Sequence, residues 1–476
     1  MKEEHEKENE SILINDNLDI NEENIEQMDT DNTGESYKIK DKIIYISKGV
    51  SSIISSIIHS FGYFSIWMLG FTTPYLISFR RNYNKNIDYS YSYSFVPIMH
   101  ISFGLTSPIS GFIEDKFGGR ITIIISDLTL IGSFYLMYFS RSIFIDYLLL
   151  FIIGIGIAIG YNITKKNACS FFMKRKALIS GLIHFVPNIL CLGLGFYYEI
   201  DILNYEVAAA YVEEMYYPKR IYMNYQILII FVIKILFTTG LASIILYFQN
   251  DPRETLKFGF NEKEQIDNNE TIENTIIEKK KKKKTKKIKL RKAIYNKRTF
   301  RLIIIVFSYF PTINFICNTM RMSLTLNFLY ELLFNMVGSG SYLIFTIIGD
   351  CFQFRILFVF LSIILTGTSF MFIKYFDKEE FFLFLGIILV AFAFSGFNVI
   401  FDRHIMNVYG REIYIEIWGI IRGFGGISEI FGIIFNFTLD EFSYIYKIVF
   451  FIFGCLNIAS LVLGIAEKEE KFNYKD

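Results

Sequence analysis

The sequence predicts an all-α integral membrane protein with about twelve transmembrane helices, arranged as two related halves of six. Apolar residues occur in blocks of about twenty, and at about 1.5 Å per residue each block spans roughly 30 Å of hydrocarbon. Of the 476 residues, 52% are hydrophobic and 20% are charged, and the charges gather between the blocks. A faint internal repeat, described below, relates the two halves.

The apolar blocks set the order of the expected helices. The first six lie at about 51–79, 91–113, 120–140, 143–164, 177–198 and 225–248. The second six lie at about 299–320, 324–348, 355–375, 381–401, 412–437 and 443–466.

Five regions follow from these blocks. Residues 1–50 are acidic and Asn-rich, so we expect a cytosolic and largely disordered tail that cannot bury enough apolar surface to fold alone. Two six-helix bundles, a Lys-rich cytosolic linker and a short cytosolic tail make up the rest: 51–248, 299–467, 249–298 and 468–476.

Positive charge predicts the orientation in the membrane. Lysines and arginines gather in every second connection, which places those connections and both termini in the cytosol. The segment Arg80–Lys85 is the exception, because it would lie on the opposite side. The plasma membrane and an organelle membrane both remain open.

The linker carries a dense run of lysines between Lys279 and Lys292. One interpretation is a patch that binds anionic lipid or has a regulatory role. The other is a solvated linker between bundles whose charge reflects only the positive-inside bias. We expect no nucleic-acid partner.

The sequence gives no sign of a metal, a cofactor or an enzyme site. The five cysteines are scattered, with no CxxC pair, and no HxxxH or HExxH motif occurs. We find no nucleophile paired with a base. A phosphate-binding G-x-x-x-x-G-K-[ST] motif is also absent from the sequence, so ATP is not the expected energy source.

The internal repeat has the form D-x-F-x-x-R. It occurs from Asp115 to Arg120 and again from Asp350 to Arg355, with an offset of 350 − 115 = 235 residues, about half the chain. Each copy follows the second helix of its half. Two related halves are a common construction among secondary transporters.

The stretch from Gly111 to Arg120, G-x-x-x-D-K-x-G-x-R, resembles the signature loop of the major facilitator superfamily. The resemblance implies two pseudo-symmetric six-helix bundles, and it implies that this loop controls conformation. It also implies that its aspartate engages the start of the eleventh helix, near Tyr409–Tyr414. Gly119 departs from the family pattern, in which that residue is often basic. The loop residues carried over are Gly111, Asp115, Lys116, Gly118 and Arg120, with Asp350 and Arg355 in the second copy.

Two longer stretches resemble the oxalate/formate antiporter and monocarboxylate porter branch. The first expected helix reads FGYFSIWMLGFTTPYLISF, and the fourth and fifth read GIGIAIGYNITKKNACSFFMKRKALISGLI. This resemblance implies a carrier for small organic anions. The branch commonly has an arginine in its eighth helix, and none lies within 324–348 here, which favours a monocarboxylate or a neutral solute over a dicarboxylate.

Arg422 is the main substrate-site candidate. It lies in WGIIRGFGGISEIFG about halfway along the expected eleventh helix, and a charge at membrane depth is costly unless it has a use. Its planar guanidinium can hold a carboxylate with two hydrogen bonds. The alternative is an internal ion pair, for example with Glu429.

The other site candidates are aromatic or titratable. Tyr161, Tyr63 and His100 are expected to line the substrate cavity, although each could be an ordinary packing residue. Glu331 and Glu429 are the proton-coupling candidates, and either could instead pair with Arg422.

We therefore expect a secondary active transporter that moves a small, monocarboxylate-like organic anion by alternating access, with proton coupling or exchange. One alternative is a carrier for a neutral or cationic nutrient or drug. Another is a transport-inactive membrane sensor or scaffold that uses the acidic tail and the lysine run.

Overall fold

The computed structural model describes residues 33–67, 94–172, 175–197, 220–250, 289–321, 327–375, 380–410, 413–439 and 445–467, with a few positions between 76 and 91. These residues hold twelve long helices: α3 (Thr33–Trp67), α5 (Phe95–Phe117), α6 (Gly119–Phe139), α7 (Ile143–Phe171), α8 (Lys176–Tyr197), α10 (Arg220–Leu246), α13 (Lys297–Arg321), α14 (Asn327–Ile348), α15 (Phe354–Tyr375), α16 (Glu380–Tyr409), α17 (Tyr414–Leu439) and α18 (Ile445–Ile465). The part of the lysine run before residue 289 lies outside the described residues.

The first helix starts earlier than the sequence predicts. α3 begins at Thr33, whereas the apolar block begins at about residue 51. No glycine or proline falls between Glu35 and Lys48, so the backbone can stay helical ahead of the apolar segment. Residues 1–48 and 49–476 form two separate units, and α3 begins in the first and ends in the second. The description below concerns 49–476.

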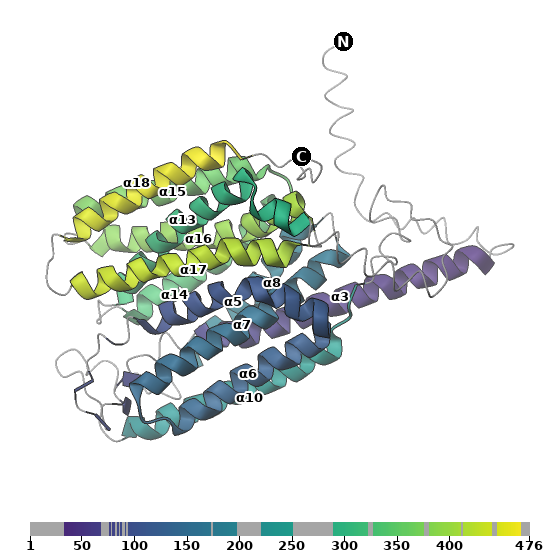
Figure 1. Cartoon of the computed structure of the whole chain (residues 1–476), viewed down its shortest axis with the longest axis horizontal. Coiled ribbons are helices and arrows are strands. Elements are labelled where there is room, and N and C mark those ends of the chain that lie inside the picture. The colour runs from purple at the N-terminus through teal and green to yellow at the C-terminus, as the bar shows by residue number, and fades with distance from the viewer. Residues whose placement is uncertain are drawn as a thin grey trace, which may run out of the picture. The chain divides into compact units, whose positions relative to one another are not determined.

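The helices of this unit pack in two matching sets. In the first half, α5 packs on α7, α6 on α7 and α10 on α6. Six helices further along, α14 packs on α16, α15 on α16 and α18 on α15. Figure 1 shows the second half, in green and yellow, gathered beside the first half in blue and teal. The repeated pairing is that of two related bundles.

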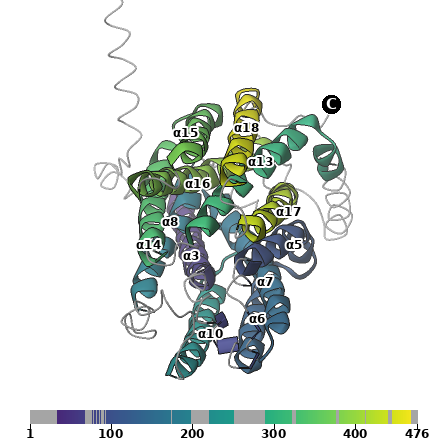
Figure 2. The same cartoon turned by 90° about the vertical axis from the view of Figure 1, so that its left-hand side faces the viewer.

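Two helix pairs make the largest contacts between the halves. α5 packs on α17, and α8 packs on α14, as the end-on view of Figure 2 shows. Glycines allow the first pair to approach closely: a Cβ built on Gly423 would lie 2.8 Å from the Gly104 carbonyl oxygen, and one on Gly419 would lie 2.5 Å from the Ser107 backbone. Small residues at such contacts are typical of membrane helices.

The helices run alternately between two ends. We call the end with the 118, 172–175, 247–298, 349–353 and 410–413 connections the linker end, and the other the opposite end. Among the described residues, nine helices are long and apolar enough to cross a membrane. Many large apolar side chains point outward, among them Leu128 (65% exposed), Phe144 (73%) and Ile245 (64%), as a lipid-facing surface requires.

A buried ion pair fastens the opposite end of the first half. Arg80 and Asp146 are both fully buried, and the Arg80 guanidinium donates to both Asp146 carboxylate oxygens. The same guanidinium donates to the backbone carbonyls of Met137 and Ser140, which end α6. The segment after α3 is therefore tied to the α6–α7 connection.

A second charged cluster fastens the linker end of the second half. Glu467, just after α18, accepts a hydrogen bond from Arg298 at the start of α13 and one of 3.3 Å from His404 on α16. Arg301 approaches the same carboxylate at 3.6 Å. The Glu467 side chain is fully buried, so these contacts hold the end of α18 against α13 and α16.

Candidate functional site

A buried ion pair joins the two halves. Lys165 on α7 donates to Asp402 on α16 over 2.7 Å, and their side chains are 1% and 3% exposed. Both helices continue past the apolar blocks that the sequence marks, to Phe171 and Tyr409, so both residues lie inside helices. An isolated charge would be costly here, and the pair offsets that cost.

Asp402 accepts hydrogen bonds from three neighbouring helices. Besides Lys165, its donors are the Ser180 hydroxyl at 3.0 Å, the Trp418 indole N–H at 2.5 Å and the Tyr414 hydroxyl at 3.3 Å. Lys165 and Ser180 belong to the first half, whereas the two aromatic residues begin α17 in the second. One carboxylate therefore holds α7, α8, α16 and α17 together.

Aromatic rings enclose the Lys165 ammonium. Its Nζ lies 4.8 Å from the Tyr161 ring centroid and 5.0 Å from the Trp418 centroid. Tyr161 precedes Lys165 by four residues, so the two share a face of α7. Aromatic faces attract cations and exclude water from the pair.

His184 connects this ion pair to α14. Its Nδ1 lies 2.6 Å from the Ser180 carbonyl, which can only accept, so Nδ1 carries a hydrogen. Its Nε2 hydrogen-bonds the Tyr161 hydroxyl, and its ring stacks on Tyr342 of the second half with 5.1 Å between centroids. The Tyr342 hydroxyl in turn accepts from the Asn398 amide at 3.4 Å. We call Tyr161, Lys165, Ser180, His184, Tyr342, Asp402, Trp418 and Arg422 the central cluster.

Arg422 joins the central cluster from α17. Its guanidinium carbon lies 3.7 Å from the Phe310 ring centroid on α13 and 5.8 Å from that of Trp418. It sits 422 − 414 = 8 residues from the start of α17, or about 12 Å at 1.5 Å per residue, and so nearer the linker end than mid-helix. The side chain is half-buried.

The glycines around Arg422 serve helix packing. Those at 419, 423 and 426 face the backbone of α5, and a Cβ on Gly426 would lie 2.6 Å from the His100 carbonyl oxygen. Gly425 faces Val306 and Phe310 of α13. The glycine-rich sequence thus lets α17 approach two neighbouring helices.

The remaining cavity candidates lie in different places. Tyr161 belongs to the central cluster. Tyr63 is buried in the first half, where its hydroxyl bonds His59 and Ser126, although its ring lies 6.1 Å from that of Tyr161. His100 is half-buried on α5 at the contact with α17. The side chains of Glu331 and Glu429 lie outside the described residues.

The Gly111–Arg120 stretch forms the tight turn from α5 to α6. Gly118 has φ +80°, a conformation that favours glycine, and only this residue separates the two helices. Gly119 has no room for a larger residue, since its Cβ would meet the Tyr247 hydroxyl at 2.1 Å. Arg120 donates to the Tyr247 carbonyl at 2.8 Å and ties the turn to the end of α10.

The α5 side of this turn faces α7 and α17. A Cβ on Gly111 would lie 2.7 Å from the Glu416 carboxyl carbon, so Gly111 makes room for the first turn of α17. Glu114 pairs with Lys166 over 2.8 Å. Asp115 and Lys116 are exposed, and the expected contact between Asp115 and α17 stays a prediction.

In the second copy of the loop, the aspartate caps a helix of the other half. Asp350 accepts from the backbone N–H groups of Ala177 and Leu178, each at 3.1 Å, at the start of α8. An anion is stabilised at the positive end of a helix. Arg403 braces this turn by donating to the Phe352 carbonyl at 2.7 Å, whereas Arg355 is exposed.

These contacts close the linker end between the halves. Asp350 binds the start of α8, and Asp402 binds α7 and α8 from the same half. Lys176 adds a third contact by donating to Asn407 over 2.9 Å. The structure therefore shows the protein with its halves in contact at the linker end.

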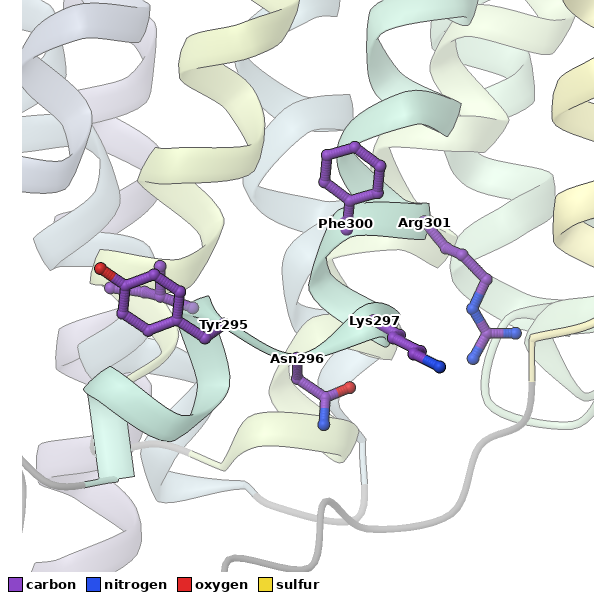
Figure 3. Close-up of a pocket in the computed structure, with 6 residues that line it drawn as sticks. Tyr295, Asn296, Lys297, Phe300 and Arg301 are labelled. Carbon is purple, nitrogen blue, oxygen red and sulfur yellow. The ribbon is translucent and has the colours of Figure 1, made fainter.

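One pocket lies at the start of α13, apart from the central cluster. Ile294, Tyr295, Asn296, Lys297, Phe300 and Arg301 line it, with a volume of about 660 Å³. In Figure 3, Lys297 and Arg301 extend on one side and Tyr295 lies across from them. Phe310, which contacts Arg422, is nine residues beyond Arg301, about 14 Å along the helix.

Among the described residues, no group of three or more His, Cys, Asp or Glu could hold a metal.

Sequence reasoning missed Lys165 and Asp402. It assigned both to cytosolic connections, because each stands just beyond an apolar block. The only local signal was the four-residue spacing from Tyr161 to Lys165, which puts an aromatic face beside the cation. Their pairing depends on tertiary contact across 237 residues.

The known proteins that resemble the chain do so in structure alone. No family model and no curated protein matches the sequence. The proton:xylose symporter XylE, bound to 6-bromo-6-deoxy-D-glucose, aligns at TM-score 0.57 and 11% identity over 89% of this chain and 95% of its own. The human organic anion transporter MFSD10 (TETRAN) aligns at 0.58 and 10%, over 88% and 99%.

The major facilitator superfamily transporter FucP, in its outward conformation, aligns at TM-score 0.59 and 12% identity, over 87% of this chain and 98% of its own. All three are described as transporters, and none as an enzyme. With near-complete coverage and the matched helix pairs of the two halves, these alignments confirm the predicted fold class. The chain has the fold of the major facilitator superfamily.

Proposed function

We propose that the chain is a secondary active transporter that carries a small, monocarboxylate-like organic anion by alternating access, with proton coupling or exchange. The fold supports secondary transport, and one structure of the same fold is a human organic anion transporter. Support for an anionic substrate comes from the cations between the two halves, Lys165 and Arg422.

The central cluster offers cationic side chains to a small anion. Lys165 is held by Asp402, and the Arg422 guanidinium lies beside the Phe310 and Trp418 rings. Arg422 can hold a carboxylate with two hydrogen bonds, and the Phe310 and Trp418 rings offer apolar walls to the rest of the solute.

The same cluster supplies a way to couple binding to movement. Asp402 holds the halves together through donors on both sides. A substrate carboxylate near Arg422 could compete with Asp402 for the Lys165 ammonium, because both anions offer the same acceptor geometry. Binding would then weaken the contact that closes the linker end. Glu331 and Glu429 remain candidates for proton coupling.

We place the linker end in the cytosol. The lysine- and arginine-rich connections lie there, which fits the positive-inside rule. Arg80 is the main exception at the opposite end, and its charge is neutralised by Asp146 in a fully buried pair. That pair supports counting Arg80 as a structural cation, so both termini are placed in the cytosol.

We also propose an anionic lipid headgroup as the ligand of the α13 pocket. Lys297 and Arg301 supply positive charge, while Tyr295 is 83% exposed and Phe300 is 63% exposed beside them. Aromatic and basic residues together are typical of the membrane interface. The pocket adjoins the lysine run of the linker, which favours the lipid interpretation of that run. Vesicles with and without phosphatidylserine test it: Lys297→Gln with Arg301→Gln should remove the dependence of activity on this lipid.

Uptake into proteoliposomes tests the transport proposal. The full chain is supplied with labelled pyruvate, lactate or formate, with and without a pH gradient. Arg422→Ala should weaken apparent affinity by about ten- to a hundredfold, since hydrogen bonds to charged groups contribute about 1.5–3 kcal/mol. Arg422→Lys keeps the charge and should lose less. Arg141→Ala removes an exposed arginine at the opposite end and should transport like the wild type.

The competing functions give different outcomes. If Arg422→Ala transports these anions as well as the wild type, the anion-site proposal is wrong. Uptake of a neutral or cationic solute that carboxylates do not inhibit would favour the alternative carrier. Binding without flux in any gradient would favour a membrane sensor or scaffold.

A further inference from the structure

A second polar cluster is buried inside the first half. It consists of His59 and Tyr63 on α3 and Ser126 and Asp127 on α6, each at most 7% exposed. Both helices are candidate membrane spans. Ionisable groups at membrane depth are costly and mark ion or proton pathways in transport proteins.

The hydrogen-bond directions in this cluster follow from its acceptors. The Ser126 hydroxyl lies 2.6 Å from the Gly156 carbonyl, which can only accept, so Ser126 donates there. The Tyr63 hydroxyl, 2.8 Å from Ser126, therefore donates to it. Since its one hydrogen is used, the Tyr63 oxygen must accept from His59 Nε2 at 2.9 Å. That Nε2–H also lies 3.1 Å from Asp127 Oδ1.

Two proton positions remain open in this arrangement. His59 Nδ1 and Asp127 Oδ2 are buried and have no hydrogen-bond partner in the structure. With a neutral imidazole and an ionised carboxylate, the cluster carries an uncompensated charge of −1. One added proton, on Nδ1 or on Oδ2, makes the cluster neutral overall. The cluster therefore offers two buried positions at which one proton can be held.

The surroundings add no competing cation. From α7, the neighbouring titratable group is Tyr161, whose ring lies 6.1 Å from that of Tyr63. From α8, His184 packs against Phe64, next to Tyr63. α10 presents uncharged Thr239 and Gly240. Among the described residues, no lysine or arginine contacts the four side chains.

Two glycines shape the site. A Cβ on Gly160 of α7 would lie 1.9 Å from the Tyr63 hydroxyl, and one on Gly240 of α10 would lie 2.6 Å from Asp127 Oδ2. Both helices therefore pack closely over the cluster and limit the access of water to the two open proton positions. The enclosure keeps the electrostatic effect of one proton large.

We propose that His59, Tyr63, Ser126 and Asp127 form a proton-binding site that loads and unloads one proton during the transport cycle. The proposal rests on the proposed function for that cycle. Tyr63 adjoins Tyr161, whose ring contacts the Lys165 ammonium at 4.8 Å. A neutral, protonated site leaves the Lys165 ammonium paired with Asp402 and keeps the linker end closed. An anionic, deprotonated site attracts that ammonium away from Asp402 and favours opening.

Opening of the linker end against pH tests the proposal without a known substrate. Spin labels are placed at Phe117→Cys and at Cys351, one in each half and both exposed, with the other four cysteines replaced by alanine. The full chain is reconstituted in nanodiscs. In this background, the population with a long label-to-label distance should rise with pH through a one-proton transition.

Asp127→Asn removes the carboxylate, so the site cannot become anionic and the linker end should stay closed at every pH. Glu467→Gln removes a carboxylate from the second half and should retain the transition. Tyr63→Phe keeps the ring but removes an acceptor of the imidazole N–H, so it should shift the midpoint. A pH response in Asp127→Asn equal to that of its parent would overturn the proposal, as would no response in the parent. If Asp127→Asn does not fold, an unshifted midpoint in Tyr63→Phe contradicts it.

Pyruvate uptake by the same variants in proteoliposomes separates this proposal from the transport proposal. Intact pyruvate exchange without pH-dependent opening would leave the carrier and reject the proton site. pH-dependent opening that requires Asp127, without flux of any tested anion, would keep the proton site and reject the proposed substrate class.

Discussion

Arg80–Asp146 and Lys165–Asp402 are both buried pairs of a cation and a carboxylate, yet they connect different things. The Arg80 guanidinium donates to the end of α6, the following turn and the start of α7, within one half. Lys165 reaches across to the other half, where Asp402 also accepts from Ser180 and Trp418. The first pair fastens a single half. Under the proposed function, the second fastens two bodies that separate during alternating access.

The two ion pairs therefore have different requirements for strength. In the proposed transport cycle, a fastening within one half is never broken, whereas a fastening between the halves must break in each cycle. Lys165 contacts Asp402 through one nitrogen, whereas Arg80 binds its carboxylate through two.

The largest expected effect is loss of the Arg80 pair. Arg80→Ala leaves Asp146 buried without its cation, which should cost about 3–5 kcal/mol of unfolding free energy. Thermal or denaturant unfolding of the purified protein measures it. Arg141→Ala, an exposed arginine in the same region, should change stability little. Equal effects of the two variants would contradict a structural assignment for Arg80.

The pair between the halves should show coupling in a double-mutant cycle. Lys165→Gln and Asp402→Asn each leave a buried charge alone, whereas the double variant leaves none. We expect the double variant to be more stable than the sum of the single losses by about 0.5–3 kcal/mol. Melting of the four proteins in one detergent gives the coupling energy. A coupling energy near zero would mean that the ion pair does not hold the halves together.

A smaller effect is expected where the halves touch through glycine. Gly423→Ala would place a methyl group 2.8 Å from the Gly104 carbonyl oxygen, and overpacking costs about 1–3 kcal/mol. Because the contact lies between α5 and α17, the strain should favour separated halves. Gly132→Ala is the matched control, since its Cβ meets nothing within 4 Å. Flux and melting of the two variants distinguish a strained contact from a general helix effect.

The smallest effect concerns the Glu467 cluster and depends on pH. Burial raises the pKa of the Glu467 carboxyl, but the hydrogen bond from His404 and the positive charge of Arg298 outweigh it, so that pKa lies below its usual value. A lowered pKa means that the carboxylate stabilises the fold above its unfolded-state pKa, about 4.3, and that this is lost as pH falls through the folded value.

Glu467→Gln should therefore lower stability by about 1 kcal/mol at neutral pH. The difference from the wild type should shrink in the acidic range. Melting temperatures of both proteins across pH test this expectation. A difference that grows as pH falls would show that the sign is wrong.

The sequence predicted the helices well because hydrocarbon thickness sets their length, and apolar blocks record it. It placed Arg422 correctly on the eleventh helix but too near the middle, because the expected helix, 412–437, begins and ends two residues before α17, Tyr414–Leu439. It missed Lys165 and Asp402 because a boundary drawn from the sequence ends each apolar block at the first charged residue. In the folded chain the two charges neutralise each other, so α7 and α16 continue through them.

The proton-site residues show the same limit. His59 and Asp127 are 68 positions apart. His59 alone is more often a packing residue than a proton relay, and the sequence interpretation did not single out Asp127. Only their contact, with an open proton position on each, distinguishes them. Gly160 and Gly240, which make the contact possible, carry no local signal of it either.

The most direct measurement is the distance between the halves at the linker end. Single-molecule fluorescence between dyes at Phe117→Cys and Cys351 follows this distance over time. We expect two interconverting distances, and we expect Asp402→Asn to shift the population toward the longer one. A single distance that Asp402→Asn leaves unchanged would contradict the claim that Lys165 and Asp402 close this end of the protein.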